Sequence, residues 1–128
     1  MIYLDTSVVL AQLFAEDRTL PPDAWRQSLV SSRLLEYEVW TRLHGRNIGA
    51  SYTNQAKAIL SGIDLIELTP VVLARALRPF PISVRTLDAL HLATVEFLRG
   101  RHYDVLFASF DQRLLQVARA LDMRIYEF

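Results

Sequence analysis

The sequence contains no cysteine, which excludes disulfide bonds and thiolate metal ligands. Lysine is almost absent: of the 14 lysine and arginine residues, Lys57 is the only lysine and all others are arginines. No apolar run approaches the ~20 residues that a membrane-spanning helix needs. The first residues also lack the basic region and cleavage site of a secretory signal. The formal net charge of +0 gives no overall attraction toward nucleic acid. We therefore expect a cytoplasmic protein that does not enter a membrane.

The composition is that of a folded protein, with 52% hydrophobic and 22% charged residues among 128. This length suits one domain, which we expect to span residues 1–128. Short apolar segments, expected to be strands, lie at residues 2–4, 28–31, 63–68, 104–108 and 123–126. Longer helical patterns lie between them, at residues 8–14, 33–46, 51–61, 71–77, 87–98 and 112–121, with a helical turn at 24–27. Such alternation predicts an α/β fold of three layers, with a mostly parallel central sheet of about five strands.

Capping residues predict where the helices begin and end. Hydroxyl side chains are expected at the starts of three helices: Thr6 or Ser7, Ser32, and Thr86. Glycine or asparagine is expected at or just past the ends of three helices: Gly45, Asn47 and Gly49 for one, Gly62 for the next, and Gly100 for the third. Asp122 is expected in the left-handed conformation that often follows a helix, because Asp tolerates it better than most residues do.

Two acidic residues lie at junctions between a strand and the following helix. Asp5 follows the apolar residues 2–4, and Asp111 follows the strand at 104–108. In a parallel sheet such junctions share one edge, and ligands bind outside the carboxyl ends of the strands. Each residue also has a purely structural explanation, since Asp5 suits a helix N-cap and Asp111 the positive end of a helix dipole.

Two further acids lie within helices. Asp88 is in the first turn of the helix at 87–98, where the helix dipole alone would favour it. Glu38 lies in the helix at 33–46, where it could pair with Arg42 one turn later. At ~100° per residue Glu38 leans toward the packed side and Glu36 points nearly the other way. The helical wheel does not decide which of these two glutamates faces a site.

Gathering several carboxylates at one sheet edge costs repulsion and desolvation unless a cation neutralises them. Hard divalent ions with oxygen ligands, Mg²⁺ or Mn²⁺, suit such a cluster. Ions bound there would activate a water and stabilise the leaving oxygen in phosphodiester hydrolysis. This interpretation requires Asp5, Asp88 and Asp111 to converge in the folded chain.

Four fragments in this order resemble a known family. They are Ile2-Tyr3-Leu4-Asp5-Thr6-Ser7, Ser32-x-Leu34-x-x-x-Glu38-Val39, Thr86-Leu87-Asp88-Ala89-Leu90-His91-Leu92-Ala93, and Ser109-Phe110-Asp111-x-x-Leu114 with the downstream Ala118-x-x-Leu121. Together they resemble the PIN-domain ribonucleases, specifically the VapC-type toxins of toxin–antitoxin pairs, over nearly the whole chain. In that family the residue after Leu121 is often glycine, whereas here it is Asp122, a difference at a helix end.

The resemblance implies a Mg²⁺- or Mn²⁺-dependent endoribonuclease with Asp5, Glu38, Asp88 and Asp111 as its acidic quartet. It selects Glu38 over Glu36. By this resemblance Asp5 and Asp88 are the main metal ligands, and Asp111 completes the metal shell directly or through water. Glu38 would orient or deprotonate the attacking water. The family also implies an RNA substrate, a cognate antitoxin and a homodimer.

Neighbouring residues are assigned supporting roles. Thr6 and Ser109 could hydrogen-bond the carboxylates or a phosphate. Arg85 and Arg113 are close in sequence to site acids and could contact phosphate through their planar guanidinium groups. Genome base composition would explain an arginine-rich chain equally well. His91, one turn after Asp88, is expected to be a core or supporting residue more often than a general acid.

Two other interpretations remain open. A phosphatase that forms a phospho-aspartate also places an Asp after its first strand, and a response-regulator receiver places an Asp at the end of a strand. However, the second acid usual in such phosphatases is replaced by Ser7, and Lys57 is mid-chain where a receiver has a late lysine. A non-catalytic RNA- or protein-binding module with the same fold is also compatible, since a complete acid set is necessary for cleavage but not sufficient.

Overall fold

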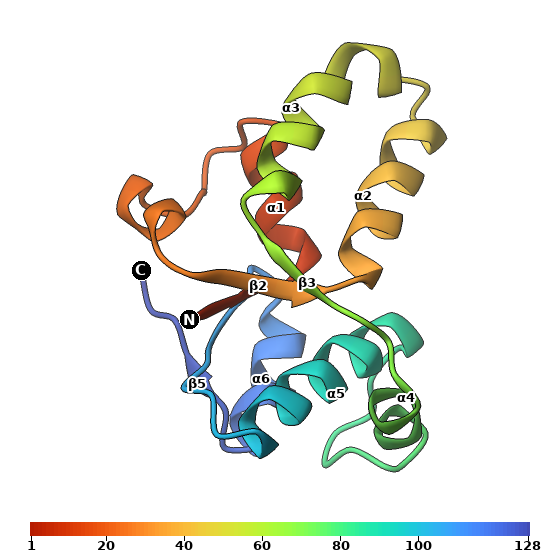
Figure 1. Ribbon diagram of the computed structural model, residues 1–128, viewed down its shortest axis with the longest axis vertical. Helices are drawn as coiled ribbons and strands as arrows, with labels where there is room; N and C mark the ends of the chain where they lie inside the picture. Colours follow the sequence, from red (N-terminus) through yellow and green to blue (C-terminus); the bar gives the residue numbers. More distant parts are fainter.

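A computed structural model describes residues 1–128 and has a five-stranded sheet between two layers of helices (Figure 1). The strands are β1 (Ile2–Leu4), β2 (Leu29–Ser32), β3 (Asp64–Ile66), β4 (Leu106–Ala108) and β5 (Arg124–Ile125). Their order in the sheet is β3-β2-β1-β4-β5, and every neighbouring pair is parallel. The predicted α/β fold with three layers is therefore confirmed, and the sheet is parallel throughout.

The helices divide between the two faces of the sheet in order along the chain. On one face lie α1 (Thr6–Leu13), α2 (Leu34–Gly45) and α3 (Gly49–Ser61), and on the other α4 (Pro70–Ala76), α5 (Thr86–Gly100) and α6 (Gln112–Ala120) (Figure 1). A 3₁₀ turn, η1 (Pro22–Arg26), precedes β2. None of the helices is both long and apolar enough to cross a bilayer.

The side chains of β1 alternate between the two halves of the core. Ile2 and Leu4 pack with the residues of α1, α2 and α3, whereas Tyr3 packs with Leu92 of α5 and Phe107 of β4. The whole strand is buried because helices cover both faces of the sheet, which explains its unbroken apolar sequence. A central strand of this kind fixes the position of whatever follows it, here Asp5.

The strand order changes direction at β1. The chain runs outward through β2 and β3, then crosses back to β4 on the other side of β1. The carboxyl ends of β1 and β4 are adjacent, with Leu4 opposite Ala108. In open α/β sheets this switch point is where a crevice forms and ligands bind. The residues that follow these two strands, Asp5 and Ser109, therefore lie beside the crevice.

Three predicted helix starts need correction. Asp5 is the N-cap residue of α1, so the prediction that Thr6 or Ser7 caps this helix is wrong. Arg85 is the N-cap of α5, and Thr86 is its first helical residue rather than its cap. Ser32 ends β2, although its hydroxyl accepts a hydrogen bond from the Leu34 amide at 3.0 Å and so performs part of the expected capping.

The predicted helix ends were also displaced. Gly45 and Gly100 are the last residues of α2 and α5, and Gly49 begins α3 instead of ending α2. No glycine has a positive φ angle. The left-handed residues are Ala15, Asn47, His102 and Asp122, with φ of 49°, 56°, 68° and 58°. The prediction for Asp122 is confirmed. Strand lengths were overestimated at 63–68 and 104–108, where only Asp64–Ile66 and Leu106–Ala108 pair.

Candidate active site

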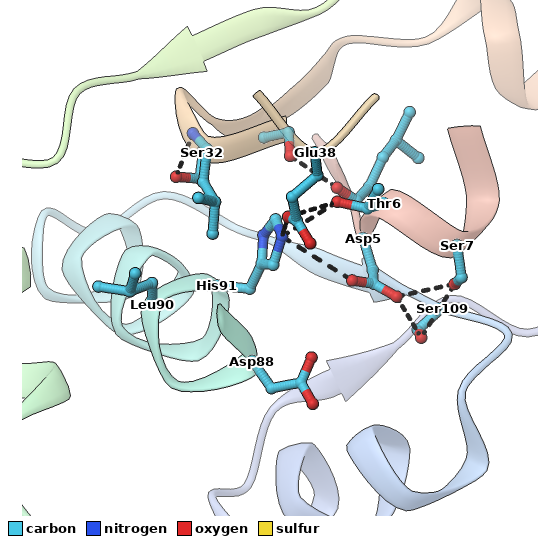
Figure 2. A network of polar contacts seen from close by, with 12 residues as sticks. Asp5, Thr6, Ser7, Ser32, Glu38, Asp88, Leu90, His91 and Ser109 are labelled. Carbon is cyan, nitrogen blue, oxygen red and sulfur yellow. Dashed lines mark hydrogen bonds and ion pairs between the residues drawn. The ribbon is translucent and has the colours of Figure 1, made fainter. Parts of the chain in front are cut away.

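Asp5 is held by hydroxyl groups at the carboxyl end of β1. Only 5% of its surface is exposed, and its side chain makes no helix-capping hydrogen bond to α1. Instead Oδ2 accepts hydrogen bonds from Ser7 Oγ at 2.7 Å and Ser109 Oγ at 2.9 Å (Figure 2). A helix cap alone therefore does not explain Asp5, because its carboxylate is engaged away from the helix amides. Ser7 was not among the predicted site residues.

Glu38 points inward from α2 toward the same region. Its Oε1 accepts a hydrogen bond from Thr6 Oγ1 at 2.7 Å and lies 2.6 Å from His91 Nε2 (Figure 2). Glu36 instead lies 3.4 Å from the guanidinium of Arg33. The two glutamates thus have different environments, a distinction that the helical wheel left open.

His91 is buried behind Glu38. Its side chain is 1% exposed, and its Nδ1 lies 2.7 Å from the hydroxyl of Tyr3 in β1. Burial opposes a charge on this imidazole, but the hydrogen bond to Glu38 and the carboxylates of Asp5 and Asp88 outweigh it and raise the pKa of His91. His91 thereby fixes the orientation of Glu38 from the buried side, and it does not face solvent.

Arg85 lies between the other two acids. Its Nε is 3.3 Å from Asp88 Oδ2 and its Nη2 is 3.4 Å from Asp111 Oδ2. The second oxygen of Asp111 accepts hydrogen bonds from the backbone amides of Arg113 and Leu114, so Asp111 also caps α6. One oxygen of Asp111 therefore caps the helix, as a purely structural role requires, while the other oxygen faces Arg85.

The three aspartates influence one another electrostatically. Burial is the largest cause that raises the pKa of Asp88, and the carboxylates of Asp5 and Asp111 raise it further. The guanidinium of Arg85 lowers it, but not enough to cancel these effects. Asp88 thus lies in a region where negative charge is crowded, and its side chain projects from the same helix as that of His91, one turn earlier in α5 (Figure 2).

One hollow of about 280 Å³ brings the four acids together. Asp5, Glu38, Asp88 and Asp111 all line it, although they come from four separate segments of the chain. The other lining residues are Thr6, Ser7, Leu10, Phe14, Glu16, Arg42 and Arg85. Arg113 is not among them, since its guanidinium donates to the carbonyl of Ser83 at 3.3 Å. We call this hollow the acidic pocket.

The acidic pocket fits a hard divalent cation in its donor chemistry, because it offers carboxylate and hydroxyl oxygens and no sulfur or free imidazole. As the side chains stand, no group of three or more His, Asp or Glu residues is arranged to hold an ion. Instead, the guanidinium of Arg85 contacts the carboxylates of Asp88 and Asp111. An ion in the pocket would therefore compete with Arg85 for both aspartates.

Some residues of the site were not predicted from the sequence. Ser7 could have been noticed because it lies two residues after Asp5, within reach of its carboxylate. Tyr3 could not, since an aromatic residue in an apolar strand is expected in the core. Arg42 was considered as a partner for Glu38 and as one of several arginines able to contact an RNA phosphate, but Arg85 and Arg113 were preferred because they lie closer in sequence to the site acids. No ion pair between Arg42 and Glu38 forms, and the ionic partner of Glu38 is His91.

Comparison with known proteins gives a consistent result. The family model for the PIN domain matches residues 2–120. Ribonuclease VapC47 of Mycobacterium tuberculosis (strain CDC 1551 / Oshkosh) is 30% identical over 126 residues, which cover 93% of this chain and 90% of that protein. Ribonuclease VapC46 of Mycobacterium tuberculosis (strain ATCC 25618 / H37Rv) is 32% identical over 133 aligned residues, covering 97% and 95%.

Proposed function

The chain belongs to the PIN-domain family, and on that basis we propose that it is a metal-dependent endoribonuclease, the toxin of a toxin–antitoxin pair. The observation that carries the proposal is the acidic pocket at the switch point of a parallel sheet, where the four predicted acids converge from four segments and Glu16 adds a fifth carboxylate to the lining. Carboxylates so close together repel one another and lose solvation, which is costly unless a cation binds between them. Bound Mg²⁺ or Mn²⁺ would lower this cost and support hydrolysis of a phosphodiester.

Asp5 and Asp88, with Asp111, are the residues that would hold the ion. Ser7 and Ser109 keep Asp5 in place by donating to Oδ2, whereas Oδ1 accepts no hydrogen bond from the protein and lies 4.0 Å from His91 Nε2. When bound, Mg²⁺ or Mn²⁺ supplies positive charge that lowers the pKa of water and stabilises the leaving oxygen. Release of Asp88 and Asp111 would free the Arg85 guanidinium for a phosphate of the substrate.

Glu38 is suited to orient the attacking water and accept its proton. Thr6 and His91 both contact Oε1, so the carboxylate is fixed while its Oε2 makes no protein hydrogen bond. The water oxygen forms a bond to phosphorus and its proton passes to Glu38, while the bond from phosphorus to the 3′ oxygen breaks and the departing oxygen takes up a proton from solvent. The products would be a 5′-phosphate on one fragment and a 3′-hydroxyl on the other.

The proposal extends to partners. The two relatives are ribonucleases of the VapC type by name. We therefore propose that this chain acts on RNA in the cytoplasm, is held inactive by a cognate antitoxin protein, and forms a homodimer. A small neighbouring gene that encodes a protein with a DNA-binding N-terminal half and a basic tail would support the toxin assignment.

The proposed activity is tested by an RNA cleavage assay with Mn²⁺ and with a chelator. Asp5→Asn and Asp88→Asn should each reduce cleavage to background, because each removes a charge that the ion requires. Both variants should remain folded, since an amide can accept the same hydrogen bonds, and circular dichroism checks this. Full cleavage by either variant, or by the wild-type protein in chelator, would refute the assignment.

A further inference from the structure

A second hollow adjoins the acidic pocket along α2. It has a volume of about 560 Å³ and is lined by Tyr37, Thr41, Arg42, Gly45 and Arg46 of α2 and its C-cap, among others. Thr6, Leu10, Glu38 and Arg42 line both hollows, so the two are continuous. We call this second hollow the α2 groove. It leads away from Glu38 toward the C-terminal end of α2.

The cations of the α2 groove are not neutralised by the protein. Glu38, Arg42 and Arg46 lie one helical turn apart and therefore on one side of α2. The ionic partner of Glu38 is His91, and Arg42 forms no ion pair or side-chain hydrogen bond with any residue. Arg46 also lacks an acidic partner, and its guanidinium rests 5.1 Å from the ring centroid of Phe14. Two exposed arginines thus line the groove beside the acids.

An unpaired aromatic ring lies on the same helix. Tyr37 is 63% exposed and contacts no other aromatic ring, although it lines the groove. An exposed aromatic beside unpaired arginines is the combination that binds single-stranded nucleic acid, since bases stack on the ring and phosphates pair with the cations. The crowded carboxylates nearby would repel a polyanion, so cations at the edge of the acidic pocket are needed to bring one close.

We propose that the α2 groove binds the segment of single-stranded RNA adjacent to the cleaved phosphate. Arg42 contacts a backbone phosphate, Arg46 contacts the next, and Tyr37 stacks on a base. This proposal rests on the proposed ribonuclease function for its substrate, but it concerns binding and is measured without cleavage. Because every base has a face on which a ring can stack, Tyr37 would contribute affinity with little sequence preference.

The test measures binding of a fluorescent 12-nucleotide RNA of mixed sequence by anisotropy. An Asp5→Asn background keeps the probe intact in Mg²⁺. Arg42→Gln should weaken binding about tenfold and reduce the slope of log affinity against log salt by about 0.7, the value for one lost contact to a single strand. Tyr37→Ala should weaken binding about tenfold and leave that slope unchanged, since stacking releases no counterions.

Matched controls come from outside the groove. Lys57→Gln removes one positive charge from the exposed face of α3, and Tyr103→Ala removes an aromatic ring that is 52% exposed. Tyr103 precedes β4 and therefore lies toward the opposite edge of the sheet from the acids. Both control variants should bind RNA within about twofold of the background protein, because neither residue lines the groove.

Gly45 allows the groove to be obstructed without disturbing the fold. A Cβ atom added there meets nothing within 4 Å, and the residue ends α2, where most side chains suit the helix better than glycine does. Gly45→Glu should reduce RNA affinity about tenfold without loss of thermal stability. Gly45→Gln, of similar size but neutral, should reduce it less, which separates charge from volume.

The outcomes are distinct for the two proposals. Weaker binding by the Arg42, Tyr37 and Gly45 variants, with unaffected controls, supports the groove even if the wild-type protein proves unable to cleave RNA. Unchanged affinity in both Arg42→Gln and Tyr37→Ala would overturn the proposal that the α2 groove binds RNA. Persistent cleavage in the Asp5→Asn background would refute the proposed catalytic site and leave the groove to be judged by binding alone.

Discussion

At the scale of single residues, the four acidic side chains are held in different ways. Asp5 is fixed by two serine hydroxyls, Glu38 by Thr6 and His91, and Asp88 and Asp111 share Arg85. The first two are therefore positioned by neutral or buried groups that an ion would not displace. The last two are paired with an exposed guanidinium that can leave.

Arg85 gives the first prediction at this scale. Arg85→Gln should bind Mn²⁺ several-fold more tightly than the wild-type protein, because the guanidinium no longer competes for Asp88 and Asp111. Calorimetric titration measures this affinity. Arg113→Gln is the control, since its guanidinium contacts the Ser83 carbonyl and neither carboxylate. Weaker Mn²⁺ binding by Arg85→Gln would show that Arg85 supports the site instead of competing with the ion.

Tyr3 gives a prediction about stability. Its hydroxyl is the partner of His91 Nδ1 in a fully buried position, so Tyr3→Phe leaves a buried nitrogen unsatisfied. We expect the free energy of unfolding at pH 7 to fall by about 1–3 kcal/mol. Urea denaturation measures the change. A loss below about 0.5 kcal/mol would mean that His91 finds another partner.

The stability difference between the wild-type protein and Tyr3→Phe should also depend on pH. Burial, with a smaller effect from Asp5, raises the pKa of Tyr3 well above its ordinary value. Above pH ~10 the unfolded chain loses this proton while the folded chain keeps it, so the free energy of unfolding falls as the pH rises. Tyr3→Phe lacks this loss. The stability difference between the two proteins should therefore shrink between pH 9 and 11, and a constant difference would contradict it.

At the scale of secondary-structure elements, the order of strands and helices was predictable because apolar periodicity changes clearly along the chain. Their ends were less so. Gly45, Asn47 and Gly49 were all predicted to end α2, and Gly100 to end α5, yet the left-handed residues are Asn47 and His102. Local sequence does not specify which of two nearby residues takes the strained conformation, since packing of the following segment decides it.

This displacement yields a prediction for α5. His102 has φ of 68°, a conformation that costs most residues about 1–2 kcal/mol and glycine almost none. His102→Gly should therefore raise the free energy of unfolding by about 1 kcal/mol. Gly100→Ala should raise it by about 0.4–1 kcal/mol, because the helical position has room for a Cβ. Thermal denaturation of both variants checks this, and destabilisation of either would contradict the assigned helix end.

At the scale of the whole molecule, the topology creates the site. Residues 104 positions apart in the chain, Asp5 and Ser109, are in contact because β1 and β4 are neighbours in the sheet. The sequence predicted that acids following parallel strands share an edge, and this placed Asp5 and Asp111 together. It could not predict the strand order, the orientation of Glu38 toward His91, or the position of Arg85 between two acids, since each depends on contacts distant in sequence.

If carboxylates from separate segments share one divalent ion, calorimetric titration of Mn²⁺ will distinguish the wild-type protein from Asp5→Asn. We expect binding by the wild-type protein and at least about tenfold weaker binding by the variant, a difference of about 1.4 kcal/mol. Equal affinity in the two proteins, or no detectable binding by the wild-type protein, would contradict it.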